Sequence, residues 1–255
     1  MRFFAMLLTL VLSSSVLHAA VVEEKLTLPN GLGTAVLYHD SAVTKAAPAV
    51  VVVHEWWGLN DYARERAKQL AELGYTAIAV DMYGTGKSTT HPKDATAFMN
   101  AALAEPEKMN ARFDAALGIL RKQSSVDGDK LFAIGYCFGG AVVLNQARRG
   151  LDLAGVASFH GSLGTETQVE PGTIKAKVLV ATGGADPMGP PKQVAGFEEM
   201  TNAGANFELL SFPNVVHSFT NPGSTALGKK YDMPLAYDAN ADKVSWAALM
   251  DMLAK

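Results

Sequence analysis

The chain has 255 residues, of which 49% are hydrophobic, and its formal net charge is −3 at pH 7. This length and composition suit one α/β domain of ordinary size with a large core. The slightly negative charge argues against a nucleic-acid-binding surface or an attachment to anionic lipid, because both need clustered cations.

Residues 1–20 predict a signal peptide. A positive start at Arg2 is followed by an almost wholly apolar run over residues 3–12 and by the stretch 13–20, which ends in the small residues Ala19 and Ala20. The apolar run is too short to span a membrane, so cleavage near Ala19 or Ala20 is favoured over an anchor. We expect a periplasmic or secreted protein whose mature part, residues 21–255, forms a single domain without a membrane anchor.

The mature chain alternates predicted strands with predicted helices. Strands are expected at residues 22–28, 33–38, 49–53, 76–80, 131–134, 153–159, 178–182 and 207–212. Helices are expected between Asn60 and Gly74, and at residues 95–103, 107–121, 140–149, 191–203 and 239–253. The first two strands form a hairpin around Asn30-Gly31. This order predicts the α/β class, with a doubly wound and mostly parallel sheet preceded by an N-terminal β-hairpin.

The segment Gly-Tyr-Cys-Phe-Gly at 135–139 joins a predicted strand to a predicted helix. A strand, a tight turn and a helix with a nucleophile at the apex make up the nucleophile elbow of α/β-hydrolases, here with Cys137 in the place of serine. The positive end of the helix favours a thiolate at this position. The alternative is a buried cysteine that acts as a small hydrophobe. Cys137 is the only cysteine of the chain, so it cannot form an internal disulfide.

Two further polar residues follow their own predicted strands. Asp186 lies in the turn after residues 178–182, and His217 lies a few residues after 207–212. Taken singly, a turn aspartate and a solvated loop histidine are common structural features. Taken together with Cys137, they occur in the order nucleophile, acid, histidine that α/β-hydrolases use.

The segment His-Glu-Trp-Trp-Gly at 54–58 follows the strand of four valines. A loop in this position supplies a backbone N–H to an oxyanion hole, so we expect that hole to use the N–H groups of Trp56 and Phe138. Glu55 is a candidate proton partner for the thiol, because a carboxylate in this aromatic setting resists ionisation unless it is paired. The alternatives are a structural hydrogen bond for Glu55 and packing against the pocket for Trp56 and Trp57.

With these segments the chain resembles the dienelactone hydrolases, which are members of the α/β-hydrolase superfamily with a cysteine nucleophile. The matching segments, in the same order along the chain, are residues 54–60, 81–83, 135–140, 183–187 and 217–219. The resemblance implies an α/β-hydrolase fold, with Cys137 as nucleophile, His217 as base and Asp186 as the residue that orients it. It also implies that Glu55 holds the resting thiol and takes its proton.

One departure from the family pattern bears on the substrate. Members that cleave dienelactone carry an arginine soon after Asp-x-Tyr and another soon after His-Ser-Phe, where this chain has Gly84-Thr85-Gly86 and Thr220-Asn221. An arginine clamp for a carboxylate is hard to replace, which argues against dienelactone itself as substrate. Lys87 is the one nearby cation, and a solvated lysine is the favoured reading of it.

Two further segments match known binding motifs only in part. Residues 84–89 imitate a phosphate-binding loop, but Asp81 stands where that motif needs glycine. His54 and Glu55 imitate a zinc-protease signature, but Gly58 replaces its second histidine. We therefore expect no metal and no cofactor.

The predicted function is hydrolysis of a small-molecule carboxylic ester, lactone or thioester through a thioacyl-enzyme. Trp57, Tyr83, His160 and Phe219 are candidate wall residues of the substrate pocket. The alternatives are a thiol-redox or binding protein on the same fold, or an acyltransferase.

Overall fold

The computed structural model of the protein describes residues 20–84, 86–165, 169–188 and 190–255, so the predicted signal peptide lies almost entirely outside the described residues. Within them the chain forms an eight-stranded sheet with the strand order β1-β2-β4-β3-β5-β6-β7-β8. Its strands are β1 (Val21–Leu28), β2 (Gly33–Asp40), β3 (Ala47–Val53), β4 (Thr76–Val80), β5 (Val126–Tyr136), β6 (Gly155–Phe159), β7 (Lys177–Gly183) and β8 (Phe207–Phe212).

Strands β4, β3, β5, β6, β7 and β8 are parallel, whereas β1 and β2 pair in antiparallel fashion at one edge. The first two strands form the expected hairpin. Its connection is a short 3-10 turn in which Asn30 and Gly31 have φ of 56° and 68°, a left-handed geometry that asparagine and glycine tolerate best. The prediction of a mostly parallel sheet with an N-terminal hairpin is confirmed.

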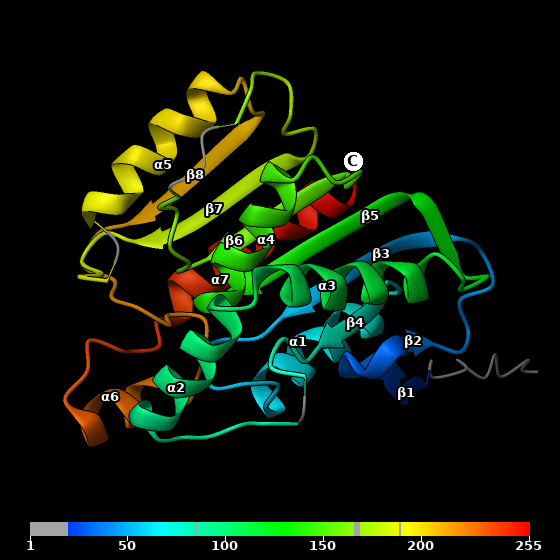
Figure 1. Ribbon diagram of the computed structural model, residues 1–255, viewed down its shortest axis with the longest axis horizontal. Coiled ribbons are helices and arrows are strands. Elements are labelled where there is room, and N and C mark those ends of the chain that lie inside the picture. The colour runs from blue at the N-terminus through cyan, green and yellow to red at the C-terminus, as the bar shows by residue number, and fades with distance from the viewer. Residues whose placement is uncertain (1–19, 85, 166–168, 189) are drawn as a thin grey trace, which may run out of the picture.

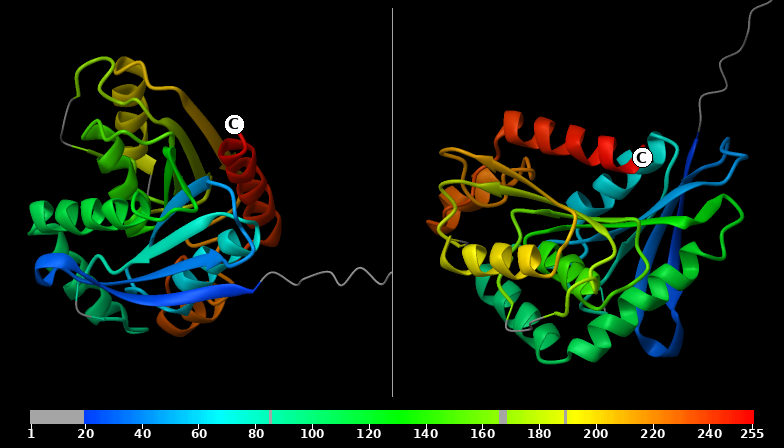
Figure 2. Two further views of the ribbon diagram at one scale, coloured as in Figure 1. Left: turned by 90° about the vertical axis from the view of Figure 1, so that its right-hand side faces the viewer. Right: turned by 90° about the horizontal axis from the view of Figure 1, so that it is seen from above.

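Helices cover both faces of the sheet, as the two views of Figure 2 show. The described helices are α1 (Asp61–Glu72), α2 (Pro92–Leu103), α3 (Pro106–Leu120), α4 (Phe138–Arg148), α5 (Pro190–Asn202), α6 (Ser224–Tyr231) and α7 (Ala239–Leu253). Helices α1 and α7 pack on one face, and α3, α4 and α5 on the other (Figure 1). Each face has its own apolar core, which is why the central strands are buried on both sides.

The central strands end where the site residues begin. Residues 50–53 of β3 are fully buried valines that lead directly into His54. The carboxyl-terminal ends of β5, β6, β7 and β8 are followed by Cys137, His160, Asp186 and His217, so these four residues lie at the same end of the sheet. The short helices α2 and α6 lie at this end (Figure 1), where Trp57 packs with Ala95 and Leu235.

Helix α6 was not predicted from the sequence. It spans eight residues, contains Gly228, and has no side-chain hydrogen bond at its N-cap, Gly223, so it carries none of the usual start signals. Among the described residues, no helix is long and apolar enough to cross a membrane.

Candidate active site

Cys137 occupies the turn between β5 and α4, with φ 53° and ψ −115°. A non-glycine residue at positive φ is strained by about 1–3 kcal/mol. The surroundings hold it there, because the N–H of Cys137 donates to the carbonyl of Phe159 at 3.0 Å and its carbonyl accepts the N–H of Gly140 at 3.0 Å. The side chain therefore stands at the apex of the turn, at the N-terminus of α4, which is the geometry of a nucleophile elbow.

The glycines on either side of the turn are required by close backbone contacts. A Cβ at Gly135 would lie 2.0 Å from the carbonyl oxygen of Gly139, and a Cβ at Gly139 would lie 2.4 Å from that of Val53. Strand and helix could not approach so closely with any larger residue. The glycine pattern of the sequence is thus explained by packing behind Cys137.

Asp186 and His217 form a buried pair. The Nδ1 of His217 lies 2.7 Å from Asp186 Oδ2, and the two residues are 6% and 4% exposed. Because the Asp186 carboxylate accepts a hydrogen bond from Nδ1, the ring hydrogen of a neutral His217 sits on Nδ1. Nε2 is then the atom that can exchange a proton. Nε2 is itself buried and has no hydrogen-bond partner of normal geometry among the described residues.

Cys137 and His217 interact electrostatically. Burial by itself lowers the pKa of His217, but the negative charge of a Cys137 thiolate and the hydrogen bond to Asp186 outweigh it and raise that pKa to about 10. His217 is therefore protonated at neutral pH when the sulfur is a thiolate. An imidazolium held beside a thiolate can supply a proton to a leaving group.

The loop after β3 is held against the nucleophile elbow by His54. Its carbonyl accepts the N–H of Gly139 at 3.1 Å, its Nδ1 donates to the carbonyl of Glu55 at 2.5 Å, and its Nε2 accepts the N–H of Met82 at 3.2 Å. Burial lowers the pKa of His54, so it stays neutral in this role.

The backbone N–H groups of Trp56 and Phe138 have no acceptor within the described part of the chain. Trp56 belongs to the loop that His54 ties to the elbow, and Phe138 follows Cys137. Two free donors on adjoining segments beside a nucleophile are the arrangement that an oxyanion hole requires.

Glu55 differs from its expected arrangement. Its buried carboxylate accepts hydrogen bonds from the Ser218 hydroxyl and, at 2.6 Å, from the Asn221 side-chain amide, and neither oxygen is bonded to Cys137. Burial raises the pKa of Glu55, while these two hydrogen bonds oppose the rise. In this structure Glu55 holds the loop that carries His217. The sequence contains no local signal for these partners, which lie more than 160 positions away.

A cavity of about 450 Å³ lies at Cys137. Its wall contains Cys137, Asp186, His217, Trp56 and His160, together with apolar side chains such as Met99, Leu103, Phe138 and Leu235. The wall includes no lysine or arginine among the described residues. Lys87 lies elsewhere, with its ammonium 5.6 Å from the ring of Phe98.

Three of the predicted wall residues lie behind the cavity. Trp57 is 2% exposed in the small cluster with Ala95, Phe219 is fully buried, and Tyr83 donates its hydroxyl to the carbonyl of Trp56 at 2.8 Å. Their aromatic bulk supports the loops that form the site. The sequence shows that they belong to these loops but not which way their side chains turn.

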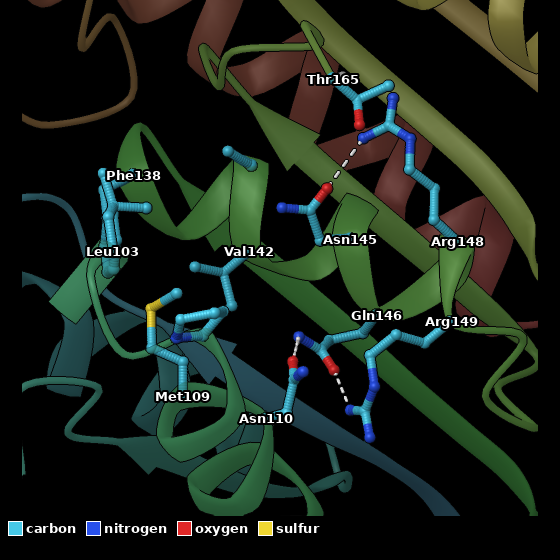
Figure 3. Close-up of a pocket in the computed structure, with 12 residues that line it drawn as sticks. Leu103, Met109, Asn110, Phe138, Val142, Asn145, Gln146, Arg148, Arg149 and Thr165 are labelled. Atoms are coloured by element: carbon cyan, nitrogen blue, oxygen red, sulfur yellow. Dashed lines mark hydrogen bonds between the residues drawn. The ribbon is translucent and has the colours of Figure 1, made fainter. Parts of the chain in front are cut away.

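A second hollow of about 390 Å³ adjoins the cavity and shares Leu103, Phe138 and Asn145 with it. Its polar side chains are already bonded to one another, as Figure 3 shows. Asn145 accepts from Arg148, and Gln146 accepts from Arg149 and donates to Asn110. By contrast, two wall residues of the cavity at Cys137 have a buried polar atom without a partner among the described residues, namely His160 Nδ1 and His217 Nε2.

The sequence model of the Dienelactone hydrolase family matches residues 34–255. The chain belongs to this family. An uncharacterized protein of Caenorhabditis elegans is 36% identical over 152 residues, which cover 57% of this chain and 92% of that protein. A Methylorubrum extorquens relative whose name includes carboxymethylenebutenolidase is 26% identical over 184 residues, which cover 68% of this chain and 63% of the relative.

A solved structure agrees with the dienelactone hydrolase assignment. A crystal structure described as a dienelactone hydrolase-like promiscuous phosphotriesterase from metagenomic libraries superposes with a TM-score of 0.82 at 33% identity. The match covers 92% of this chain and 98% of the other. The family resemblance and the α/β-hydrolase fold expected from the sequence are therefore confirmed.

Proposed function

We propose that this protein hydrolyses a small-molecule carboxylic ester, lactone or thioester through Cys137, His217 and Asp186, with a thioacyl-enzyme intermediate. Membership of the dienelactone hydrolase family makes the protein a hydrolase of ester or lactone bonds. The proposal of these three residues and of a thioacyl-enzyme is supported by the buried Asp186–His217 pair, which lines one cavity together with a strained cysteine.

In the acylation step, a thiolate at Cys137 attacks the carbonyl carbon and the π electrons move to the carbonyl oxygen. The free N–H groups of Trp56 and Phe138 donate to this oxyanion. The tetrahedral intermediate then collapses, the bond to the leaving oxygen or sulfur breaks, and His217 gives that atom its Nε2 proton.

In the deacylation step, His217 acts as a base. Formation of the thioester removes the negative charge of the sulfur, which is a main reason for the raised pKa of His217. That pKa then falls, so the imidazole, which has given its proton to the leaving group, stays neutral and takes a proton from the attacking water. The acid product leaves, and the thiolate and imidazolium form again. The loss of one charge thus switches His217 from acid to base.

We assign Glu55 the task of holding the His217 loop through Ser218 and Asn221. Neither oxygen of Glu55 is hydrogen-bonded to Cys137, so transfer of a proton from the thiol to Glu55, as the family resemblance implies, would require the carboxylate and the sulfur to come within hydrogen-bond distance of each other. Asn221 lies in the region where dienelactone-cleaving relatives carry an arginine. The lack of lysine and arginine among the described wall residues favours uncharged aryl esters and lactones as substrates over anionic ones.

The proposal is tested with the mature protein and a panel of uncharged lactones, aryl esters, thioesters and one phosphotriester. We expect turnover of an uncharged ester or lactone and, in rapidly quenched samples, an intact mass raised by one acyl group located on Cys137. Reaction in the presence of an added alcohol or amine separates hydrolysis from acyl transfer. A thiol that oxidises readily but never carries an acyl group would favour the redox or binding alternative.

We also propose that the protein is exported after removal of residues 1–20. Expression of the full chain should yield a periplasmic or secreted protein whose intact mass corresponds to a start at or next to residue 21. Recovery of the uncleaved chain in the cytoplasm would contradict this.

A further inference from the structure

A second buried imidazole, that of His160, lies beside His217. His160 follows β6, is 1% exposed and has φ 42°. Its ring centroid lies 5.2 Å from that of His217, with the ring planes at 66°, an edge-to-face contact. The catalytic steps proposed above do not use it.

His160 is the end of a hydrogen-bonded chain that begins on helix α1. Arg66 Nε lies 3.4 Å from the Tyr62 hydroxyl, that hydroxyl lies 2.6 Å from Thr220 Oγ1, and Thr220 Oγ1 lies 2.7 Å from His160 Nε2. Arg66 also donates to the carbonyl of Thr220 at 2.7 Å and forms an ion pair with Asp242. The guanidinium group is therefore held through its Nε and Nη2 atoms.

The direction of this chain follows from which atoms can donate. A guanidinium only donates, so the Tyr62 oxygen accepts from Arg66. If the Thr220 hydroxyl donated to the Tyr62 oxygen as Arg66 does, the hydroxyl proton of Tyr62 would lack an acceptor among the described residues. The consistent order is that Tyr62 donates to Thr220 and Thr220 donates to His160. Nε2 of His160 is then an acceptor, and the ring hydrogen sits on Nδ1. Nδ1 is buried without a hydrogen-bond partner among the described residues whichever order holds, so this order leaves one polar group fewer unpaired than the reverse order.

We propose that the Arg66–Tyr62–Thr220–His160 chain is a positioning device for His217, which locks His160 as the neutral Nδ1–H tautomer. A neutral ring in edge contact restricts the orientation of His217 without competing for its proton. Thr220 belongs to the same loop as His217, so Arg66 anchors that loop through both the carbonyl and the hydroxyl of Thr220. The inference rests on the catalytic role proposed for His217.

Burial, together with the positive charges of His217 and Arg66, lowers the pKa of His160 well below its usual value. The titratable or charged groups that face it from the surrounding elements are Arg66 and Tyr62 on α1, Tyr136 on β5, Cys137 after β5 and His217 after β8. Among these groups, the positive charges of Arg66 and His217 oppose protonation of His160.

The first test reads the tautomer of His160 in the resting protein by ¹⁵N NMR of labelled histidine side chains. We expect the Nδ1–H tautomer with no titration between about pH 5 and 8. An Nε2–H tautomer, or a titration in that range, would overturn the inference. This measurement needs no variant and no substrate, so it is independent of whether an acyl-enzyme forms.

The second test breaks the chain. Thr220→Val removes the donor to Nε2, so we expect a mixture of tautomers and a kcat about ten-fold lower with little change in KM. Thr220→Ser restores the hydroxyl and should restore both readouts. Tyr237→Phe, which removes only the bond to the far oxygen of Asp242, is the control and should change neither. Wild-type kcat and tautomer in Thr220→Val would refute the positioning role.

Discussion

Replacement of Cys137 by alanine is expected to lower kcat/KM for an activated aryl ester at least about ten thousand-fold, because no other group can form the covalent acyl-enzyme. The residual rate would come from substrate binding and the oxyanion donors alone. The acyl adduct seen by intact mass in the wild type should be absent. Steady-state kinetics measure the loss of kcat/KM and intact-mass spectra measure the loss of the adduct, while denaturation curves confirm that the variant is folded.

Cys137→Ser is the matched comparison for this prediction. It keeps an attacking atom at the same strained turn but replaces a thiol by a hydroxyl, which ionises far less readily. The raised pKa of His217 depends on the charge of the Cys137 sulfur, so histidine NMR should show a lower pKa for His217 in both variants. If Cys137→Ala turned over esters at the wild-type rate, the nucleophile would have to lie elsewhere.

Asp186→Asn is expected to lower kcat/KM about a hundred- to ten thousand-fold and to shift the alkaline limb of the pH profile. In the wild type, His217 carries its proton up to a pKa of about 10, so acylation should decline only as the pH rises through that value. The hydrogen bond to Asp186 helps to raise the pKa of His217. A weaker bond to asparagine lowers this pKa and therefore moves the alkaline limb of the profile to lower pH.

The exposed Asp152, changed to asparagine, provides the control for the lost negative charge. Its profile should coincide with that of the wild type. The measurement is kcat/KM against pH for one uncharged ester with each of the three proteins. An Asp186→Asn profile identical to that of the wild type would show that Asp186 does not set the protonation of His217.

Local pattern accounts for most of the fold. The valines of β3 are buried on both faces, Asn60 caps α1 by accepting the N–H of Ala63, and Asn30-Gly31 turns the hairpin, each as the sequence predicts. These features depend on residues within a few positions of one another. Helix α6 was missed because its first turn has no local capping signal.

The sequence also shows that Cys137, Asp186 and His217 each follow a predicted strand, and parallel strands bring their carboxyl ends to one end of the sheet. The amino-acid sequence by itself thus determined the class of fold, the elbow and the membership of the family. Only the tertiary structure decided that Glu55 bonds to Ser218 and Asn221, that Tyr83 and Phe219 are buried outside the wall of the cavity, and that Arg66 reaches His160 through two hydroxyls. The physical reason is that hydrogen-bond partners and side-chain directions at such long sequence separations depend on how the strands and helices pack, which no local pattern of residues encodes.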